Sequence, residues 1–324
     1  MKILVTGSAG FVGSHISRFL AKKNYKIFGL DCLSDYYDKK LKLDRIKWIG
    51  KKNFKFVQLD LLDKKSLDNF FASQKIELVI HMAAQPGVIY SMENPFSYIE
   101  NNIKAYLNLL EVAKKNKIKN IIYASSSSVY GNSSKIPFQE SAILNKPLTI
   151  YAATKITDEH ISYVYSNLYS MNFVGLRFFT VYGPWGRPDM SPYIFVKKIL
   201  ANQEIELFDK GNGIRDFTYI DDVVFSIDSI VKVFLKKKKL PSCEVYNIGN
   251  GSPVKISKFL SIVQDELKIN AKKINKPSRK VDMKATFSDS SKFYKYYRYA
   301  PRIDIKDGIK EFIKWFKKYH KINK

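Results

Sequence analysis

Three side chains that can exchange protons lie within one stretch of the sequence. Tyr151 and Lys155 are four residues apart in Tyr-Ala-Ala-Thr-Lys, and the serine run Ser125 to Ser128 precedes them. Residues four apart on a helix share one face, so the phenol and the ammonium can be neighbours. A free phenol has a pKa of about 10, and a nearby positive charge favours its ionised form. The spacing predicts a proton-transfer set made of Ser126, Tyr151 and Lys155.

A second pattern lies at the N-terminus, where glycines follow an expected strand. Gly7, Gly10 and Gly13 come directly after the apolar run 2–6 and before residues with helical spacing. Glycines let a backbone approach a pyrophosphate closely, and a helix N-terminus attracts its negative charge. The pattern therefore predicts a dinucleotide-binding turn. Its contact residues are expected to be Gly7, Gly10, Phe11, Val12 and Gly13.

Further cofactor contacts are expected where the next strands end. Asp31 ends the second expected strand, where its carboxylate can accept both adenosine-ribose hydroxyls and would repel a 2′-phosphate. The sequence thus favours NAD over NADP, with Lys155 and Tyr151 at the nicotinamide ribose. His81 is interpreted as structural rather than catalytic. The remaining residues expected near the cofactor are Asp60, Leu61, Ala83, Ala84 and Asn101.

Short apolar runs alternate with helical periods in the first half of the chain. This alternation predicts an α/β fold, a Rossmann-like doubly wound parallel sheet with a smaller C-terminal substrate-binding region. The expected strands are 2–6, 26–30, 53–59, 77–82, 120–124 and 172–178, and the expected helices near the site are 101–117 and 151–169. We expect residues 1–180 to form an NAD-binding domain and 181–324 mainly the substrate-binding region, with segments returning to the first.

The second half of the chain does not continue this regular alternation. It begins with an expected loop at 183–188 and a helix from about residue 192. Residues 217–220 are expected to form a short strand, followed by a helix for which Asp221 and Asp222 are good N-caps. A further strand is expected at 245–248. The pattern at 305–319 predicts a closing amphipathic helix.

Composition limits the classes of protein that fit. The chain has 324 residues, of which 45% are hydrophobic, enough for a sizeable core. Two cysteines cannot form a disulfide framework or a four-cysteine zinc site, and no metal is expected. The sequence shows neither a signal peptide nor an apolar run long enough to span a membrane. These features favour a soluble, cytoplasmic protein.

The formal net charge is +25, which raises the question of a polyanionic partner. Most lysines fall in short clusters at expected helix ends and turns, such as Lys236 to Lys239, and no known nucleic-acid-binding motif accompanies them. We therefore interpret the charge as a solvated surface, with no nucleic acid as partner. The charge should still favour the approach of an anionic substrate.

Taken together, these motifs resemble those of the extended short-chain dehydrogenases/reductases, in the branch of NAD-dependent nucleotide-sugar epimerases. The stretch from Arg177 to Met190 is similar to the pattern of UDP-glucuronate 4-epimerases, as are Asp35 to Arg45 and Ala124 to Gly131. The resemblance runs nearly end to end. It implies a Rossmann fold, bound NAD, a UDP-sugar substrate and a homodimer.

The resemblance also implies roles for individual residues. Ser126, Tyr151 and Lys155 match the catalytic set of the family. Hydroxyls that would bind the sugar carboxylate are Ser127, Ser128 and Thr180, and Arg187 would also reach the substrate. Arg215 and Arg279 resemble the arginines that bind the diphosphate, a group that guanidinium suits well.

Two departures from the family pattern keep alternatives open. Pro86 and Ile89 stand where the family usually has Ala and Arg, and Arg279-Lys-Val-Asp282 replaces a usual Gln-Pro-Gly-Asp. The loss of the arginine at Ile89 leaves a 4-epimerase of a neutral UDP-hexose, such as UDP-glucose or UDP-N-acetylglucosamine, as the main alternative. A 4,6-dehydratase, which needs an acidic pair after the strand-five hydroxyl, and a decarboxylase are less favoured. A non-catalytic NAD-binding protein is a further hypothesis.

Overall fold

The computed structural model describes residues 1–132, 135–237, 239–279 and 281–322. Within them, a central sheet of seven parallel strands has the order β10-β6-β5-β4-β1-β2-β3. The apolar runs form these strands because both faces of the sheet are covered. All four residues of β4, for example, are buried. The strands are β1 (Lys2–Thr6), β2 (Lys26–Asp31), β3 (Phe54–Gln58), β4 (Leu78–His81), β5 (Asn120–Ser126), β6 (Asn172–Phe178) and β10 (Cys243–Ile248).

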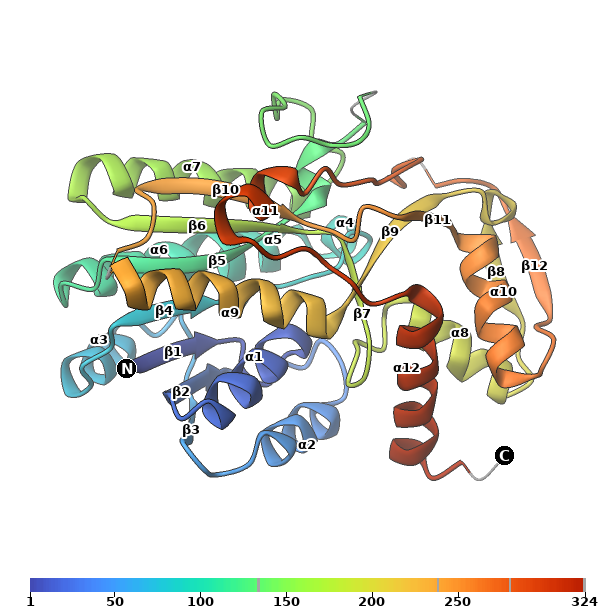
Figure 1. Cartoon of the computed structure of the whole chain (residues 1–324), viewed down its shortest axis with the longest axis horizontal. Helices are drawn as coiled ribbons and strands as arrows, with labels where there is room; N and C mark the ends of the chain where they lie inside the picture. Colours follow the sequence, from blue (N-terminus) through green and yellow to red (C-terminus); the bar gives the residue numbers. More distant parts are fainter. Residues whose placement is uncertain (133–134, 238, 280, 323–324) are drawn as a thin grey trace.

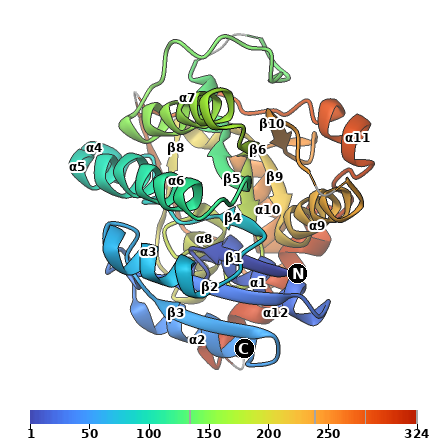
Figure 2. The same cartoon turned by 90° about the vertical axis from the view of Figure 1, so that its left-hand side faces the viewer.

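Helices cover the sheet on two sides, which confirms the predicted α/β Rossmann-like fold (Figures 1 and 2). On one side lie α3 (Lys64–Ser73), α6 (Ala105–Lys115) and α7 (Ile150–Tyr169). On the other lie α1 (Phe11–Lys22) and α9 (Ile220–Lys237), which pack against each other. The strand order changes direction between β1 and β4, and such a switch point is where a doubly wound sheet binds its ligand.

The second half of the chain adds a smaller layer beside the carboxyl ends of the strands (Figure 1). It contains a three-stranded sheet of order β11-β9-β7 and a two-stranded sheet, β12-β8. One strand of this half, β10, returns to the central sheet and pairs with β6. The elements are β7 (Thr180–Tyr182), α8 (Ser191–Leu200), β8 (Ile205–Phe208), β9 (Ile214–Tyr219), β11 (Pro253–Lys255), α10 (Ile256–Leu267), β12 (Lys273–Lys276), α11 (Ser291–Tyr297) and α12 (Ile305–His320).

The predicted N-caps of the helix after β9 are wrong. Helix α9 begins at Ile220, which places Asp221 and Asp222 inside its first turn. The Asp222 carboxylate instead accepts hydrogen bonds from the Tyr299 hydroxyl at 2.6 Å and from the backbone N–H of Ile303 at 3.0 Å. A distant segment thus uses the carboxylate that the local pattern assigned to a cap.

The helix expected over 101–117 is longer and irregular. It comprises α5 (Pro95–Tyr98), a π-helical turn (Ile99–Lys104) and α6, with the short α4 (Tyr90–Glu93) before it. A π-turn inserts an extra residue into a helix and frequently marks a functional site.

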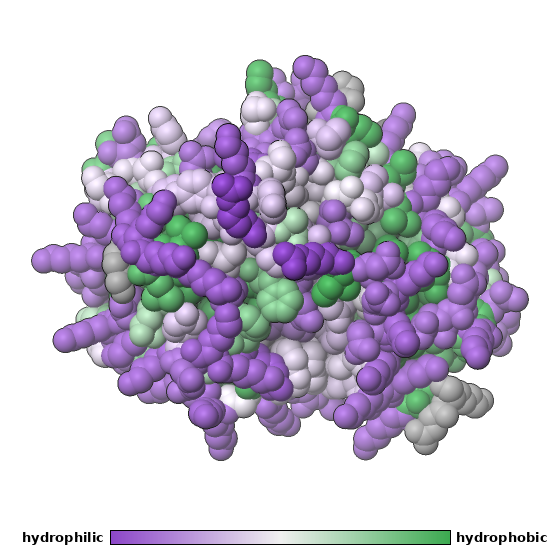
Figure 3. Space-filling model, viewed as in Figure 1, coloured by the Kyte–Doolittle hydropathy of each residue, from purple (hydrophilic) through white to green (hydrophobic). Residues whose placement is uncertain are grey.

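The surface is rich in polar side chains over the face drawn in Figure 3. Lys236 and Lys237 end α9, as expected for a solvated cluster, and Lys238 lies outside the described residues. Within the described part of the chain, no helix combines the length and the apolar composition needed to cross a membrane.

Candidate active site

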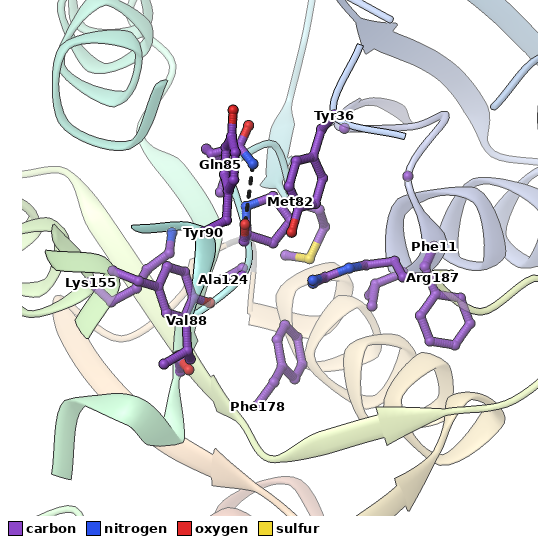
Figure 4. A pocket seen from close by; sticks show the side chains of 18 of the residues that line it. Phe11, Tyr36, Met82, Gln85, Val88, Tyr90, Ala124, Lys155, Phe178 and Arg187 are labelled. Carbon is purple, nitrogen blue, oxygen red and sulfur yellow. Dashed lines mark hydrogen bonds between the residues drawn. The ribbon is translucent and has the colours of Figure 1, made fainter. Parts of the chain in front are cut away.

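A cavity of about 730 Å³ opens where the parallel strands end. Side chains from the N-terminal turn, the strand ends, α7 and the loop after β7 converge on it (Figure 4). Most of the residues predicted from the sequence line this cavity, although they are scattered along the chain. They are Gly7, Gly10, Phe11, Val12, Gly13, Asp31, Asp60, Leu61, Ala83, Ala84, Asn101, Ser126, Ser127, Ser128, Tyr151, Lys155, Thr180, Arg187 and Arg215.

The turn between β1 and α1 has the shape that a pyrophosphate requires. Gly7 has φ +67°, and a Cβ there would lie 2.7 Å from the backbone nitrogen of Ala83. A Cβ at Gly13 would overlap the carbonyl oxygen of Gly7. Gly10 is the N-cap of α1 and makes no side-chain cap, so backbone N–H groups of the first turn are left for an anion. The residues present therefore fit the predicted dinucleotide.

Asp31 is held in place for the adenosine ribose. Its two carboxylate oxygens accept hydrogen bonds from the backbone N–H groups of Ala9 at 3.0 Å and Leu33 at 2.9 Å. Each oxygen keeps further acceptor capacity, which two ribose hydroxyls can use. Asp60 caps the next turn by accepting from the backbone N–H of Leu62 at 2.9 Å. This end of the cavity suits NAD and disfavours an additional phosphate.

The end of β4 combines a buried, hydrogen-bonded histidine with small side chains that leave space for the cofactor. His81 is buried, and its Nδ1 lies 2.7 Å from the hydroxyl of Thr6. Burial, helped by the charge of Lys155, lowers the pKa of His81 to about 3. The imidazole is therefore neutral near pH 7, and its position supports the structural role that we expected. The small side chains of Ala83 and Ala84 follow directly.

The π-turn distinguishes two neighbouring asparagines. Asn101 lines the cavity and donates a hydrogen bond to the carbonyl oxygen of Ser97 at 2.8 Å. Asn102 is buried and accepts from the backbone N–H of Gln85 at 2.7 Å. It also donates to the Thr154 hydroxyl on α7 at 3.0 Å. Asn102 thus ties the loop after β4 to the helix that carries Tyr151.

Tyr151 and Ser126 reach the cavity from two different elements. The Thr149 hydroxyl accepts from the backbone N–H of Ala152 at 3.2 Å and caps α7, which fixes Tyr151 in the first turn. Ser126 ends β5, and its hydroxyl accepts from the backbone N–H of Ser128 at 3.2 Å. A helix start and a strand end therefore bring the phenol and the hydroxyl to the same cavity.

Lys155 lies one helical turn after Tyr151 and is 2% exposed. Its ammonium lines the cavity and also donates a hydrogen bond to the Asp158 carboxylate at 3.0 Å. A positive charge on this face of α7 favours the phenolate of Tyr151 over the phenol. The arrangement can therefore remove a proton from a hydroxyl held between Tyr151 and Ser126.

The opposite side of the cavity carries cationic and hydroxyl groups. Arg187 pairs with Asp189 through two hydrogen bonds, one of 2.9 Å from Nε, and the Tyr36 hydroxyl donates to the same carboxylate at 3.0 Å. Burial alone would raise the pKa of Asp189, but the Arg187 guanidinium lowers it. Arg215 donates to the carbonyl oxygen of Met283 at 2.8 Å. Both arginines remain charged and face a space large enough for a nucleotide sugar.

Arg279 is the one predicted site residue that the structure does not bring to the cavity formed by the described residues. Its guanidinium lies over the ring of Phe208, 3.6 Å from the ring centroid. Asp282 and Met283, a few residues later, do line the cavity. A contact of Arg279 with a diphosphate stays a prediction.

Sequence reasoning missed several polar residues of the site. Tyr36 and Asp189 lie inside stretches used for the family resemblance, but only the fold shows that they meet. Arg45 is fully buried, and its guanidinium donates to the carbonyl oxygens of Ala9 at 3.1 Å and Trp185 at 2.7 Å. Asp158 could have been found from its spacing, since it follows Lys155 by three residues on the same helix face.

The sheet, the glycine turn and the Ser-Tyr-Lys set define a Rossmann-fold protein with a nicotinamide dinucleotide site. The sequence pattern of the NAD dependent epimerase/dehydratase family matches residues 3–249, and this chain belongs to that family. The match confirms the family resemblance and the NAD dependence that the sequence predicted.

Two relatives and one solved structure show how far the similarity extends. Protein CapI of Staphylococcus aureus is 41% identical over 333 residues, covering 99% of this chain and 100% of that protein. UDP-glucuronate 4-epimerase 4 of Arabidopsis thaliana is 41% identical over 330 residues, covering 98% of this chain and 76% of that protein. The crystal structure of UDP-glucuronic acid 4-epimerase from Bacillus cereus with UDP-glucuronic acid and NAD superimposes with a TM-score of 0.91 at 34% identity, covering 98% of this chain and 100% of that one.

Proposed function

We propose that this chain is an NAD-dependent UDP-glucuronate 4-epimerase, which interconverts UDP-glucuronate and UDP-galacturonate. The observation that carries the proposal is that Ser126, Tyr151 and Lys155 line the same cavity as Arg187 and Arg215. The similarity to UDP-glucuronate 4-epimerases over nearly the whole chain supports the same substrate.

The chain's own residues supply the proton chemistry of this reaction. Tyr151, as a phenolate, takes the proton of the sugar 4-hydroxyl while the Ser126 hydroxyl shares it. Lys155 favours the phenolate and holds the nicotinamide-ribose hydroxyls. Bound NAD would supply the hydride chemistry at C4 of the sugar, by which the configuration of that carbon inverts through a 4-keto sugar. There is no net oxidation, so the cofactor is expected to stay bound between turnovers.

The hydroxyl groups of Ser127, Ser128 and Thr180 are proposed to prevent a side reaction, the loss of carbon dioxide from the sugar. The 4-keto intermediate is a β-keto acid, which loses carbon dioxide when its carboxylate can align with the ketone. We infer that Ser127, Ser128 and Thr180 hold that carboxylate in an orientation that disfavours the loss. Arg215 would pair with the diphosphate, a role that its place on the cavity wall supports.

A neutral UDP-hexose is the second candidate substrate, and Ile89 is the observation that favours it. This side chain lines the cavity at a position where the family pattern usually has an arginine. An apolar side chain there supplies no charge for a sugar carboxylate. Side-by-side kcat/KM values for UDP-glucuronate, UDP-glucose and UDP-N-acetylglucosamine decide between them. The proposal expects UDP-glucuronate to be preferred, and a preference for either neutral sugar would replace it.

We also propose that the protein is a homodimer. Phe96, Ile99 and Leu107 lie exposed along α5, the π-turn and α6, and Tyr163 and Leu168 lie exposed on the neighbouring α7. Phe96 is 80% exposed and Leu168 63%. Exposed apolar side chains on neighbouring helices are typical of an interface between subunits. A second copy related by twofold symmetry would cover it.

The setting of the reaction is a further proposal. Both cysteines, Cys32 and Cys243, are free thiols, which suits the reducing cytoplasm. A uronic acid activated as its UDP derivative is a donor for polysaccharide biosynthesis. The proposal therefore places the enzyme in the cytoplasm, upstream of a glycosyl transfer. The proposal would be contradicted if the protein were detected only in the extracellular fraction.

A further inference from the structure

Lys155 has a buried partner that the proton chemistry above does not use. Its ammonium donates a hydrogen bond to the Asp158 carboxylate at 3.0 Å, and both side chains are 2% exposed. The second carboxylate oxygen of Asp158 has no hydrogen-bond partner among the described residues. A lysine and an aspartate enclosed together in this way form a pair whose charges act strongly on their surroundings.

The pair lies in line with Tyr151 along one face of α7. Tyr151, Lys155 and Asp158 are spaced i, i+4 and i+7, so Asp158 lies about 10 Å beyond Tyr151 along the helix axis. Tyr151 and Lys155 line the cavity, whereas Asp158 lies behind them in the interior. The ammonium therefore stands between the phenol and the carboxylate.

Burial raises the pKa of Asp158 to about 6, so near pH 7 its carboxylate is the charge that opposes Lys155, and the other titratable groups around the pair do not take this role. His81 from β4 is neutral, because burial and then the Lys155 charge lower its pKa to about 3. Burial holds the pKa of Tyr106 from α6 well above its usual range. Glu159 carries a negative charge, but Arg177 from β6 pairs with both of its oxygens at 2.9 and 2.7 Å.

We propose that Asp158 is a positioning residue that holds Lys155 from the interior side and sets how strongly its charge acts on Tyr151. An ammonium has three N–H donors, so one bond to Asp158 leaves two for the nicotinamide-ribose hydroxyls. The negative charge of Asp158 opposes the attraction between the Lys155 ammonium and an ionised Tyr151. The proposal deepens the proposed function, since the ammonium and the phenol are those of the same site.

The direct test is Asp158→Asn, which keeps a hydrogen-bond acceptor for Lys155 and removes the negative charge. The phenol of Tyr151 should then ionise about one pH unit lower, and the acidic limb of kcat against pH should move with it. Ultraviolet titration of the phenolate provides a second readout. The difference between each protein and its Tyr151→Phe counterpart isolates this one phenol. Asp158→Ser, which leaves room for water, should release NAD several-fold faster and keeps the test possible if the Asn variant does not fold.

The matched control is Asp228→Asn on α9. Asp228 is also a buried carboxylate paired with lysine, at 2.7 Å from Lys23, but it is remote from the cavity. Its replacement should lower stability and leave both the pH profile and NAD release unchanged. Unchanged titration and NAD release in the Asp158 variants, or an upward shift of the acidic limb, would overturn the proposal. If the wild type does not turn over UDP-glucuronate, the proposed function fails, while the titration and NAD release still decide the role of Asp158.

Discussion

The chemistry of this site depends on how side chains with ordinary properties are placed. A phenol can act as a base near neutral pH when a positive charge stands beside it, and α7 supplies that charge by fixing Lys155 one turn after Tyr151. The spacing alone predicted this pair. The Asp158 carboxylate behind Lys155 could not be weighed from the sequence, because its influence comes from burial.

Replacement of Tyr151 by Phe tests the assigned base. Tyr151→Phe removes only the hydroxyl, so kcat should fall by a factor of roughly 10²–10⁴ while NAD stays bound. Initial rates and the NAD content of the purified protein provide the two readouts. Tyr163→Phe, at an exposed tyrosine of the same helix, is the control and should keep the wild-type rate. Wild-type turnover in the Tyr151 variant would remove this residue from the mechanism.

Buried histidines should make the protein sensitive to acid. Burial lowers the pKa of His81 from 6.5 to about 3, so the unfolded chain binds the proton more readily than the folded one between these values. The contribution of His81 to stability is present above pH 6.5 and is lost as the pH falls, by about 1.4 kcal/mol per pH unit. His81→Asn should therefore flatten this part of the stability profile.

Urea unfolding at several pH values measures this effect. His15 provides an independent second case, because burial also lowers its pKa to about 3. His15→Asn is expected to flatten the same window. An unchanged slope in both variants would mean that these imidazoles do not drive the loss of stability in acid.

At the scale of elements, long-range contacts fix the loops around the cavity. Arg45 on helix α2 (Lys39–Ile49) donates to backbone oxygens of the glycine turn and of the loop after β7. One buried guanidinium therefore holds the cofactor turn against the loop that carries Arg187. The π-turn acts similarly, because Asn102 binds the backbone of Gln85 on one side and Thr154 on the other.

Arg45→Met is the variant that tests this link. It keeps most of the apolar stem and leaves the carbonyl oxygens of Ala9 and Trp185 without their buried donor. We expect a loss of about 2–4 kcal/mol in the free energy of unfolding and a lower NAD content after purification. Lys47→Met, at an exposed position of the same helix, should change neither quantity. Equal stability of the two variants would show that the Arg45 contacts are dispensable.

The features that the sequence predicted are local ones. The glycine turn, the strand ends and the Tyr-Lys spacing depend on neighbours within a few residues, and the structure places them in one cavity. The failures involve distant partners. The local pattern predicts a cap at Asp222 because nothing nearby in the sequence reveals Tyr299. The hydrogen bond between Tyr36 and Asp189 joins residues 153 positions apart in the sequence. The packing of Arg279 on Phe208 is likewise a contact between residues far apart in the sequence.

At the scale of the whole molecule, the exposed apolar side chains of α5 to α7 are the surface on which the proposed homodimer depends. Leu107→Glu places a charge on this face and should shift the protein from dimer to monomer. Light scattering coupled to gel filtration measures the mass. Ile274→Glu, at an exposed position on β12, is the control and should leave the dimer intact. A monomeric wild type would contradict the proposed assembly.

The central claim is that the protein inverts the configuration at C4 of UDP-glucuronate with NAD that stays bound between turnovers. The most direct test is to incubate the purified protein with UDP-glucuronate, without added NAD, and to follow the anomeric sugar signals by NMR. The account predicts that UDP-galacturonate forms until an equilibrium mixture is reached. No change with UDP-glucuronate, with or without added NAD, would contradict it. Conversion of UDP-glucose or UDP-N-acetylglucosamine instead would show that the protein is a 4-epimerase of a neutral UDP-hexose.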